Sequence, residues 1–394
     1  MPSLAGATQD EVRRSNLSTV LRLLHLGGAH TRSQLTALTG LNRSTVGDLV
    51  TALASIDLVR EKPGDVRGVG RPSLVVEPVP TSVAVLALDL RVERTEAALV
   101  GLGGEVFARA ERRHPDRDRD ALIDDVARVS REVLDAMPAG CAWVGTCAGV
   151  PGVVRVMDGL VRFAPNLGWT DVPLGDLLLE RIGAGRGDVS IRNDADLGVL
   201  AEHLRGSARD SSTVLYLAGD IGIGGGLFVD GHPLVGAGGY GGEVGHMRIN
   251  PEGRTCRCGS RGCWETEIGF AALTRAAGIG DTLPTLVEAA QSGDAGVLDA
   301  FATVADWLGI GLANLVNMLN PQSIVLGGHL SAVYAIAGDR VDAQVSGALP
   351  AARELVRIRS SEMGGDATLT GAAEVAFASL LDDPVHVLRD SAAS

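Results

Sequence analysis

The chain has 394 residues, of which 45% are apolar and 21% are charged. This composition excludes a disordered protein, and the length is sufficient for two or three domains. The sequence contains no run of about 18 consecutive apolar residues and no apolar segment close to its first residue. It therefore predicts neither a membrane span nor a secretory signal, and we expect a cytoplasmic protein without a membrane partner.

The charge is distributed unevenly along the chain. Its formal net value is −13, whereas residues 1–80 contain nine basic and seven acidic residues, a net charge of +2. The remaining residues therefore carry −15, a charge that repels nucleic acid. Any contact with DNA is thus expected in the N-terminal segment.

Three helices are predicted in that segment. Apolar residues recur at helical spacing over residues 17–24, and the pattern stops at Gly27–Gly28. Thr31 can cap the next helix, with Gln34 completing a capping box. After a short turn, Asn42 can cap a third helix, whose apolar face contains Val46, Leu49, Val50 and Leu53. This succession indicates a helix-turn-helix.

Two short strands, residues 58–61 and 74–77, follow these helices and enclose a glycine-rich segment that also contains arginines. Such a hairpin is typical of a wing, whose arginine can enter the minor groove of DNA. We therefore interpret residues 1–80 as a winged helix-turn-helix DNA-binding domain; a three-helix protein-interaction domain with a mobile loop is the alternative. The residues expected to contact DNA are Arg32, Ser33, Arg43, Ser44, Thr45, Asp48, Arg67 and Arg71.

Alternating strands and helices are predicted after residue 80. A buried strand over residues 83–90 precedes two shorter strands, a helix over residues 121–137 and another strand. A second series begins at residues 214–217, continues through a glycine loop at residues 222–226 and includes a strand that ends at Gly327–Gly328. This order is typical of an α/β fold that binds ligands at the carboxyl ends of its strands.

A cluster of cysteines with one histidine supplies the strongest motif. Three of the five cysteines fall within eight positions, which favours metal binding in a reducing compartment over a disulfide framework. With the preceding histidine they form the pattern H-x9-C-x-C-x4-C. Three thiolates and an imidazole suit tetrahedral zinc and leave no open position, so one structural zinc per chain is predicted. Its ligands would be His246, Cys256, Cys258 and Cys263; the alternative is four unrelated loop residues.

Several motifs occur together between residues 81 and about 380. They are residues 164–169 (APNLGW), 193–195 (NDA), 222–226, 242–246 (GEVGH), the cysteine-rich loop up to Glu265, 320–328 and 369–373 (LTGAA). This set resembles that of the ROK family (repressors, open reading frames, sugar kinases). The resemblance implies an α/β, two-lobed, actin-like sugar-kinase fold with a zinc loop. A winged helix-turn-helix in front of this fold is similar to the repressor branch of the family.

The resemblance also implies how the chain is divided. Residues 1–80 would form the DNA-binding domain and residues 81–394 the sugar-binding domain. Within the latter, the first lobe would comprise about residues 81–200 together with a C-terminal helix at about residues 371–385. The second lobe would comprise about residues 201–370.

A sugar site is implied by the same resemblance. A sugar offers hydroxyl groups that donate and accept hydrogen bonds, so that its pocket needs carboxylates and amides. His246 would bind zinc through one ring nitrogen and a sugar hydroxyl through the other. Helix caps or hydrogen bonds within loops are the alternative roles of these side chains. The matching residues are Asn166, Asn193 and Asp194, expected in the first lobe, and Glu243, His246 and Glu265, expected in the second.

Kinase activity is the main functional alternative. The residue that matches Asp194 is the general base of the family's kinases, but ATP also needs loops whose backbone approaches its phosphates. The first such loop, approximately D-x-G-G-T in the family, is replaced here by residues 89–93 (DLRVE), and Ile221 replaces the usual threonine before Gly222. Asp196 also stands where asparagine is usual. We therefore expect no enzymatic activity and no catalytic residue; only in a kinase would Asp194 be one.

The sequence thus predicts a sugar-responsive transcriptional repressor of carbohydrate metabolism genes. Its partners would be operator DNA, a monosaccharide or sugar-phosphate effector and further copies of the chain in a homodimer or homotetramer. A sugar kinase with an accessory DNA-binding domain and a constitutive DNA-binding protein with a vestigial cleft are the alternatives. Thermal stabilisation by ATP would indicate the kinase, whereas a response to sugar alone would indicate the regulator.

Overall fold

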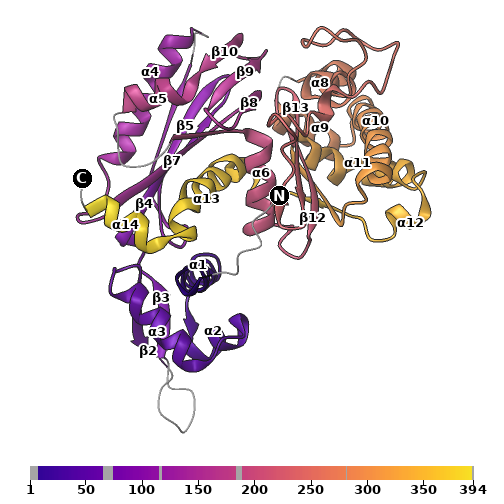
Figure 1. Cartoon of the computed structure of the whole chain (residues 1–394). Coiled ribbons are helices and arrows are strands. Elements are labelled where there is room, and N and C mark those ends of the chain that lie inside the picture. The colour runs from indigo at the N-terminus through magenta and orange to yellow at the C-terminus, as the bar shows by residue number, and fades with distance from the viewer. Residues whose placement is uncertain (1–7, 65–73, 115–117, 183–188, 281, 393–394) are drawn as a thin grey trace. The chain divides into compact units, whose positions relative to one another are not determined.

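The computed structural model describes residues 8–64, 74–114, 118–182, 189–280 and 282–392 (Figure 1). Its contacts define two compact units: residues 1–148, 175–190 and 372–394 form the first, and residues 149–174 and 191–371 form the second. This division differs from the expected one, in which residues 1–80 stand alone and the two lobes meet near residue 200. The difference arises because residues 149–174 and the helix that begins at Asp194 pack within the second unit.

Capping residues define the three helices at the start of the first unit. Helices α1 (Gln9–Gly27), α2 (Arg32–Thr39) and α3 (Arg43–Ala54) follow Thr8, Thr31 and Asn42, and each of these side chains accepts a hydrogen bond from a backbone N–H. The predicted capping box of Thr31 and Gln34 is confirmed. Helix α1 begins earlier than its apolar pattern predicts, because Thr8 and Glu11 form a second capping box.

A small antiparallel sheet follows these helices. It contains β1 (His30–Thr31), β2 (Val59–Pro63) and β3 (Leu74–Pro78) in the order β1-β3-β2. Each helix contributes fully buried leucines, among them Leu21, Leu35 and Leu53. Three helices and a hairpin are the elements expected for a winged helix-turn-helix. The segment between β2 and β3, with Arg67 and Arg71, lies outside the described residues.

The rest of the first unit is an α/β structure. Its elements are η1 (Pro80–Ser82), β4 (Val83–Leu90), β5 (Arg94–Gly101), β6 (Val106–Arg113), α4 (Arg119–Leu134), β7 (Ala142–Val150), α5 (Leu174–Ile182), β11 (Val189–Asn193), α13 (Ala367–Asp382) and α14 (Pro384–Ala392). The sheet has the order β11-β7-β4-β5-β6, and its strands β4 to β6 form the predicted meander. Helix α4 packs on this meander. Helix α13 approaches β7 at Gly145, where an added Cβ would lie 2.4 Å from the carbonyl oxygen of Ala376.

Helix α1 packs on helix α13 within this unit through a buried polar contact. The Nε2 atom of His25 lies 3.2 and 3.3 Å from the two carboxylate oxygens of Glu374, and both side chains are buried. The Nδ1 atom of His25 accepts a hydrogen bond from the Gly103 N–H at 2.9 Å, and Phe377 meets the ring edge-on. Because Nδ1 is an acceptor, the ring proton is on Nε2 and is donated to Glu374. The N-terminal helices are therefore attached to α13 by more than the connecting chain.

The second unit contains two sheets. Its elements are β8 (Val153–Arg155), β9 (Leu160–Ala164), β10 (Trp169–Pro173), α6 (Asp194–Leu204), β12 (Thr213–Gly219), β13 (Ile223–Val229), β14 (His232–Pro233), η2 (Val244–His246), α7 (Glu265–Ile268), α8 (Phe270–Ala277), α9 (Leu283–Gln291), α10 (Ala295–Leu319), β15 (Ser323–Gly328), α11 (His329–Val345), α12 (Pro350–Arg353), β16 (Arg357–Ser360) and η3 (Gly364–Asp366). The larger sheet has the order β14-β13-β12-β15-β16 and the smaller one the order β10-β9-β8. The α/β class predicted from the sequence is confirmed.

Helix α10 is the one described helix that is long and apolar enough, by length and composition, to cross a membrane. Its Phe301, Leu308 and Leu312 side chains are fully buried in a core that they share with α11 and with strands β12 and β15. Burial against other parts of the same unit is typical of a core helix.

The glycine-rich segment at residues 222–226 was predicted as a loop, and that prediction is wrong. Gly224, Gly225 and Gly226 lie in β13, which pairs with β12. A Cβ atom at Gly226 would lie 2.2 Å from the carbonyl oxygen of Ala195 in α6, and one at Gly225 would lie 2.5 Å from that of Gly242. Successive residues of a strand face opposite sides. Glycine is therefore needed because α6 and the segment after Gly242 approach the strand closely from its two sides.

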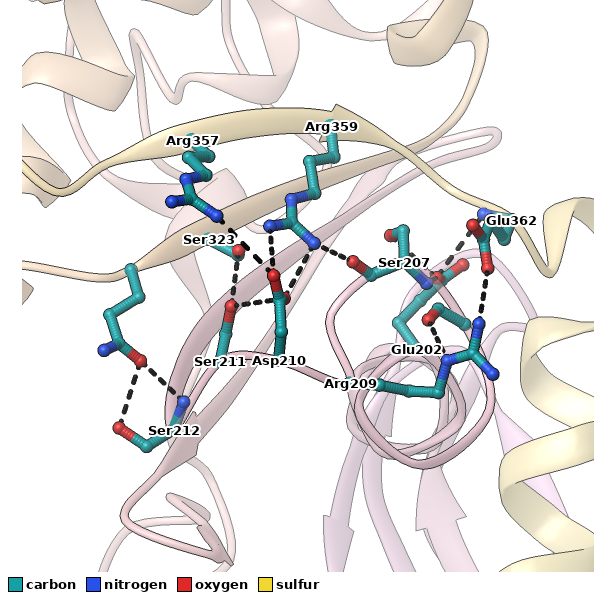
Figure 2. A network of polar contacts seen from close by, with 12 residues as sticks. Glu202, Ser207, Arg209, Asp210, Ser211, Ser212, Ser323, Arg357, Arg359 and Glu362 are labelled. Carbon is teal, nitrogen blue, oxygen red and sulfur yellow. Dashed lines mark hydrogen bonds and ion pairs between the residues drawn. The ribbon is translucent and has the colours of Figure 1, made fainter. Parts of the chain in front are cut away.

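Polar contacts hold the far end of α6 (Figure 2). The Glu202 carboxylate is fully buried and accepts hydrogen bonds from the backbone N–H and the hydroxyl of Ser207, at 2.8 and 3.0 Å. Asp210, in the loop after α6, forms an ion pair with Arg359 of β16 at 2.8 Å. Helix α6, which starts with Asp194, is thus fixed at its C-terminal end independently of any ligand.

Candidate functional site

The residues of the cysteine-histidine motif meet in the second unit. The ligand atoms of His246, Cys256, Cys258 and Cys263 all lie within 4.8 Å of one another. The sulfur atoms of Cys258 and Cys263 are 3.6 Å apart, and the sulfur of Cys256 is 3.7 Å from His246 Nδ1. Sulfur ligands of a tetrahedral zinc ion, with bonds of about 2.3 Å, would be roughly 3.8 Å apart. The cluster can therefore hold a metal ion, and the alternative of four unrelated residues is wrong.

Backbone contacts shape the loop that carries the cysteines. The carbonyl oxygen of Gly262 accepts hydrogen bonds from the Ile249 and Asn250 N–H groups. A Cβ atom at Gly262 would lie 1.7 Å from the Asn250 carbonyl oxygen, so that only glycine fits there. The following Trp264 is fully buried and donates its indole N–H to the Trp307 carbonyl at 2.8 Å. Trp264 therefore anchors the loop in the core.

The two ring nitrogens of His246 face different neighbours. Nδ1 faces the Cys256 sulfur and lies 3.9 Å from Glu265 Oε1, whereas Nε2 lies 3.8 Å from Glu243 Oε2. Nδ1 is therefore the nitrogen on the side of the metal cluster. Nε2 lies on the side of Glu243, an arrangement that suits the two roles expected of His246.

Asn166 and Glu265 converge beside Gly222. A Cβ atom at Gly222 would lie 2.9 Å from Glu265 Oε2 and 3.7 Å from Asn166 Nδ2. Arg257 donates a hydrogen bond from Nη1 to Asn166 Oδ1 at 2.7 Å. The sequence analysis missed Arg257, and its position between two cysteines was the signal that could have identified it. The metal-binding loop thus contributes Glu265 directly and contacts Asn166, which follows β9, through Arg257.

Asn193 acts as the cap of helix α6. Its Oδ1 accepts hydrogen bonds from the N–H groups of Ala195 and Asp196 at 2.8 and 3.2 Å, and its Nδ2 donates to the Gly152 carbonyl at 3.0 Å. This is the alternative role considered for the polar residues, and it leaves one amide hydrogen for a ligand. Asp194 follows as the first helical residue and accepts the Ala195 N–H at 2.9 Å.

All six predicted sugar-site residues lie in the second unit. The expectation that Asn166, Asn193 and Asp194 belong to a different lobe from the other three is therefore not met. Strand β13 connects the two groups, because Gly222 precedes it beside Glu265 and an added Cβ at Gly224 would lie 3.8 Å from Asp194 Oδ1. The metal-binding loop and the start of α6 thus approach the same strand.

Asp196 is a buried carboxyl group next to these residues. It is 8% exposed, and this burial raises its pKa to about 7. The negative charge of Glu243 contributes to the rise, whereas Arg192 opposes it. Asp196 is therefore close to half protonated at neutral pH.

We expect Asp196→Asn to stabilise the protein in mildly alkaline solution. Because its folded-state pKa is raised, Asp196 favours folding below the ordinary value of 3.8, and this contribution is lost as the pH rises through about 7. Asparagine has no such dependence, so the variant should gain about 1–3 kcal/mol over wild type near pH 8 relative to pH 4. Urea unfolding of both proteins at these two pH values measures the difference. If the variant and wild type differed in free energy of unfolding by the same amount at pH 4 and pH 8, the raised pKa of Asp196 would be contradicted.

Exposure of the expected DNA contacts varies. Among the described ones, Ser33, Arg43, Ser44 and Asp48 are exposed, and Arg32 and Thr45 are half-buried. The Arg32 guanidinium is engaged in a bidentate ion pair with Glu61 of β2, with both distances 2.6 Å. A contact of Arg32 with DNA would require this pair to open, so the exposed end of α3 is better placed for base contacts.

The strand end at Asp89 forms a closed turn. The Arg91 N–H donates to the Arg94 carbonyl at 2.8 Å, and strands β4 and β5 pair directly on either side. The Asp89 carboxylate is buried, which raises its pKa, and Arg91 Nε lies 2.6 Å from its Oδ2 and opposes that rise. Arginine side chains and a tight turn therefore occupy the position where the resemblance predicted a degenerate phosphate loop.

Relatives match nearly the whole chain. The family described as "ROK family" matches residues 85–378. The xylose repressor of Bacillus spizizenii is 28% identical over 385 residues, which cover 95% of this chain and 98% of the relative.

Solved structures share the fold. A ROK family transcriptional regulator matches with a TM-score of 0.78 and 24% identity, covering 98% of this chain and 100% of its own. A ROK family glucokinase from Streptomyces griseus, in complex with glucose and AMPPNP, matches with a TM-score of 0.65 and 26% identity, covering 74% of this chain and 99% of its own. The α/β, actin-like sugar-kinase fold expected from the sequence is thereby confirmed.

Proposed function

This chain belongs to the ROK family, and from that premise we propose that it is a sugar-responsive, DNA-binding transcriptional regulator that represses carbohydrate metabolism genes. The observation that carries the proposal is the extent of the match to a xylose repressor, which covers 95% of this chain. So long a match includes the N-terminal helices as well as the ROK part. Similarity to a glucokinase covers only 74% of the chain.

The N-terminal elements support binding to operator DNA. Helices α2 and α3 are joined by a short turn at Gly40, and the β2–β3 hairpin follows in the order of a winged helix-turn-helix. Arg43 and Ser44, at the start of α3, are exposed where a recognition helix contacts bases. The protein would bind as a homodimer or homotetramer, since paired half-sites require paired recognition helices. As such a regulator, the protein would act in the cytoplasm.

A monosaccharide or sugar phosphate is the proposed effector. Glu265 Oε2 and Asn166 Nδ2 place an acceptor and a donor beside Gly222, and Asp194 and His246 add further polar groups to the same unit. A sugar hydroxyl can satisfy both kinds of group at once. The metal at the cysteine cluster would be a structural zinc ion, because three thiolates and an imidazole leave no open position.

A sugar kinase is the second candidate, favoured by the retention of Asp194 and by the likeness to a glucokinase. The turn at Asp89 argues against it. The Arg91 side chain pairs with the buried Asp89 carboxylate, and the Arg91 backbone N–H is donated to the Arg94 carbonyl and so is not offered to a phosphate. We therefore propose a regulator that does not transfer phosphate.

The test is operator affinity of the full chain with and without saturating sugar, with D-xylose and D-glucose as the first probes. A sugar that binds the DNA-free and DNA-bound forms unequally should change operator affinity by about 5–150-fold. Linkage requires operator DNA to change sugar affinity by the same factor. Release of ADP from ATP and sugar, without an effect of sugar on DNA binding, would favour the kinase instead.

Arg43→Ala should weaken operator binding by about 1–3 kcal/mol if Arg43 contacts a base, and it should relax specificity at that position. The reason is the loss of a bidentate donor at the exposed start of α3. Fluorescence anisotropy with cognate and single-substitution operators measures both effects. Arg60→Ala is the matched control, because Arg60 pairs with Glu77 in the hairpin. If Arg43→Ala bound the operator with wild-type affinity and specificity, α3 would not be the recognition helix.

A further inference from the structure

We propose that Arg257 is a positioning residue that sets the hydrogen-bonding polarity of the sugar site by orienting Asn166. This inference rests on the proposed function, because it concerns the site that would hold the sugar. Arg257 lies between the metal-cluster residues Cys256 and Cys258, and its Nη1 is 2.7 Å from Asn166 Oδ1.

The chemistry of the two groups fixes the orientation of the amide. A guanidinium group only donates hydrogen bonds, so the atom of Asn166 that faces Arg257 must be the oxygen. The Asn166 NH2 group is then directed elsewhere, and Nδ2 lies 3.7 Å from the position that a Gly222 Cβ would occupy. Glu265 Oε2, which only accepts when ionised, lies 2.9 Å from the same position. Arg257 thus places a donor next to an acceptor.

This pairing of donor and acceptor suits a single hydroxyl group. The oxygen of a sugar hydroxyl can accept from Asn166 while its proton is donated to Glu265. If the amide of Asn166 turned over, two acceptors would face the hydroxyl, which has one proton to give. One of them would then remain unsatisfied, at a cost that burial by the bound sugar increases. The orientation of Asn166 therefore decides whether this hydroxyl is recognised.

The surroundings of Arg257 indicate that it does not hold the loop together. Its side chain is exposed and has no carboxylate partner among the described residues. Arg261 in the same loop behaves differently, because it donates to the carbonyl groups of Gly253 and Glu252 and so supports the loop. Arg257 contacts a residue outside the loop, and a metal ion bound by the neighbouring Cys256 and Cys258 would fix the backbone from which it extends. Metal binding would in this way support the orientation of Asn166.

Calorimetric titration of the full chain tests the inference, with D-xylose, D-glucose and their monodeoxy analogues as probes. Arg257→Ala should weaken binding of the sugar that wild type prefers by about 10-fold or more, the effect of losing a charge-assisted hydrogen bond. It should also reduce the difference in affinity between that sugar and the deoxy analogue that lacks the recognised hydroxyl. Zinc content and thermal midpoint should stay at wild-type values. Arg254→Ala, which removes another exposed arginine of the loop, should change none of these quantities.

A second variant distinguishes a role of Arg257 in orienting the Asn166 amide from a role in stabilising the loop. Asn166→Asp keeps an oxygen for Arg257 but replaces the donor with an acceptor, so it should lose sugar affinity as Arg257→Ala does. Wild-type affinity and selectivity in Arg257→Ala would overturn the inference while leaving the proposed function intact. Loss of zinc or a lowered thermal midpoint in Arg257→Ala would overturn it in favour of a structural role. If wild type bound none of the sugars, the proposed function would fail, and this inference would fail with it.

Discussion

Cys258→Ser and removal of the metal by a chelator should each lower the thermal midpoint by about 10 °C and abolish sugar binding. The metal-cluster atoms lie within 4.8 Å of one another, so a bound ion holds the loop closed, and His246 and Glu265 depend on that loop. Structural zinc contributes about 10–16 kcal/mol to the folding of isolated zinc-finger peptides. We expect a contribution of about 3–5 kcal/mol here, because the buried Trp264 also anchors the loop in the core, and this free energy corresponds to roughly 10 °C.

Metal analysis and differential scanning fluorimetry provide the measurements for this prediction. Wild type should contain one zinc ion per chain, and Cys258→Ser much less. Cys141→Ser is the matched control, since Cys141 lies outside the cluster and should retain both zinc and stability. Purified wild type without zinc, together with an unchanged midpoint for Cys258→Ser, would show that the cluster is not a metal site.

His25→Ala should destabilise the first unit by about 3–5 kcal/mol, the usual cost of removing one partner of a buried polar pair. The variant removes the contact of His25 Nε2 with the buried Glu374 carboxylate and the hydrogen bond from the Gly103 N–H to His25 Nδ1. The packing of Phe377 against the imidazole ring is lost as well. Urea unfolding followed by circular dichroism measures the change, and limited proteolysis near residue 80 reports whether the N-terminal helices become detached.

Two further variants distinguish the buried contact of His25 with Glu374 from exposed contacts between the same two helices, α1 and α13. Arg22→Ala removes an ion pair with Asp382 whose side chains are 41% and 70% exposed, so it should cost less than about 1 kcal/mol. The double variant His25→Leu with Glu374→Leu replaces both polar partners and should recover much of the lost stability. If His25→Ala and Arg22→Ala lowered the free energy of unfolding equally, the buried pair would contribute no more to stability than the exposed ion pair.

Features that depend on neighbouring residues could be predicted from the sequence. Thr31, Gln34 and Asn42 cap helices through hydrogen bonds to residues three positions away, and the structure contains these caps. The cysteine cluster was predictable for the same reason, because three of its four ligands lie in one short loop. The meander of β4 to β6 follows from successive apolar segments joined by short turns.

Features that depend on distant residues could not be predicted in this way. The glycines of β13 have the composition of a loop, and their need for close packing depends on where α6 and Gly242 lie in space. Asn166 and Arg257 are separated by 91 positions, and His25 and Glu374 by 349, so no local pattern connects either pair. The grouping of residues 149–174 with the second unit likewise depends on tertiary packing. The DNA and sugar contacts themselves stay predictions.

The attachment of α1 to α13 restricts how such a regulator can exchange parts during evolution. Recombination near Pro80 would transfer the three N-terminal helices and the β2–β3 hairpin as one segment, since the chain between β3 and β4 is short. A donor segment with an apolar residue in place of His25 would nevertheless remove the hydrogen bond that His25 Nε2 makes with the buried Glu374 carboxylate. A viable chimera would then need a compensating change 349 positions further along the chain. We expect residues 25 and 374 to be inherited together, and laboratory fusions that move only the first 80 residues to need a matching substitution at Glu374.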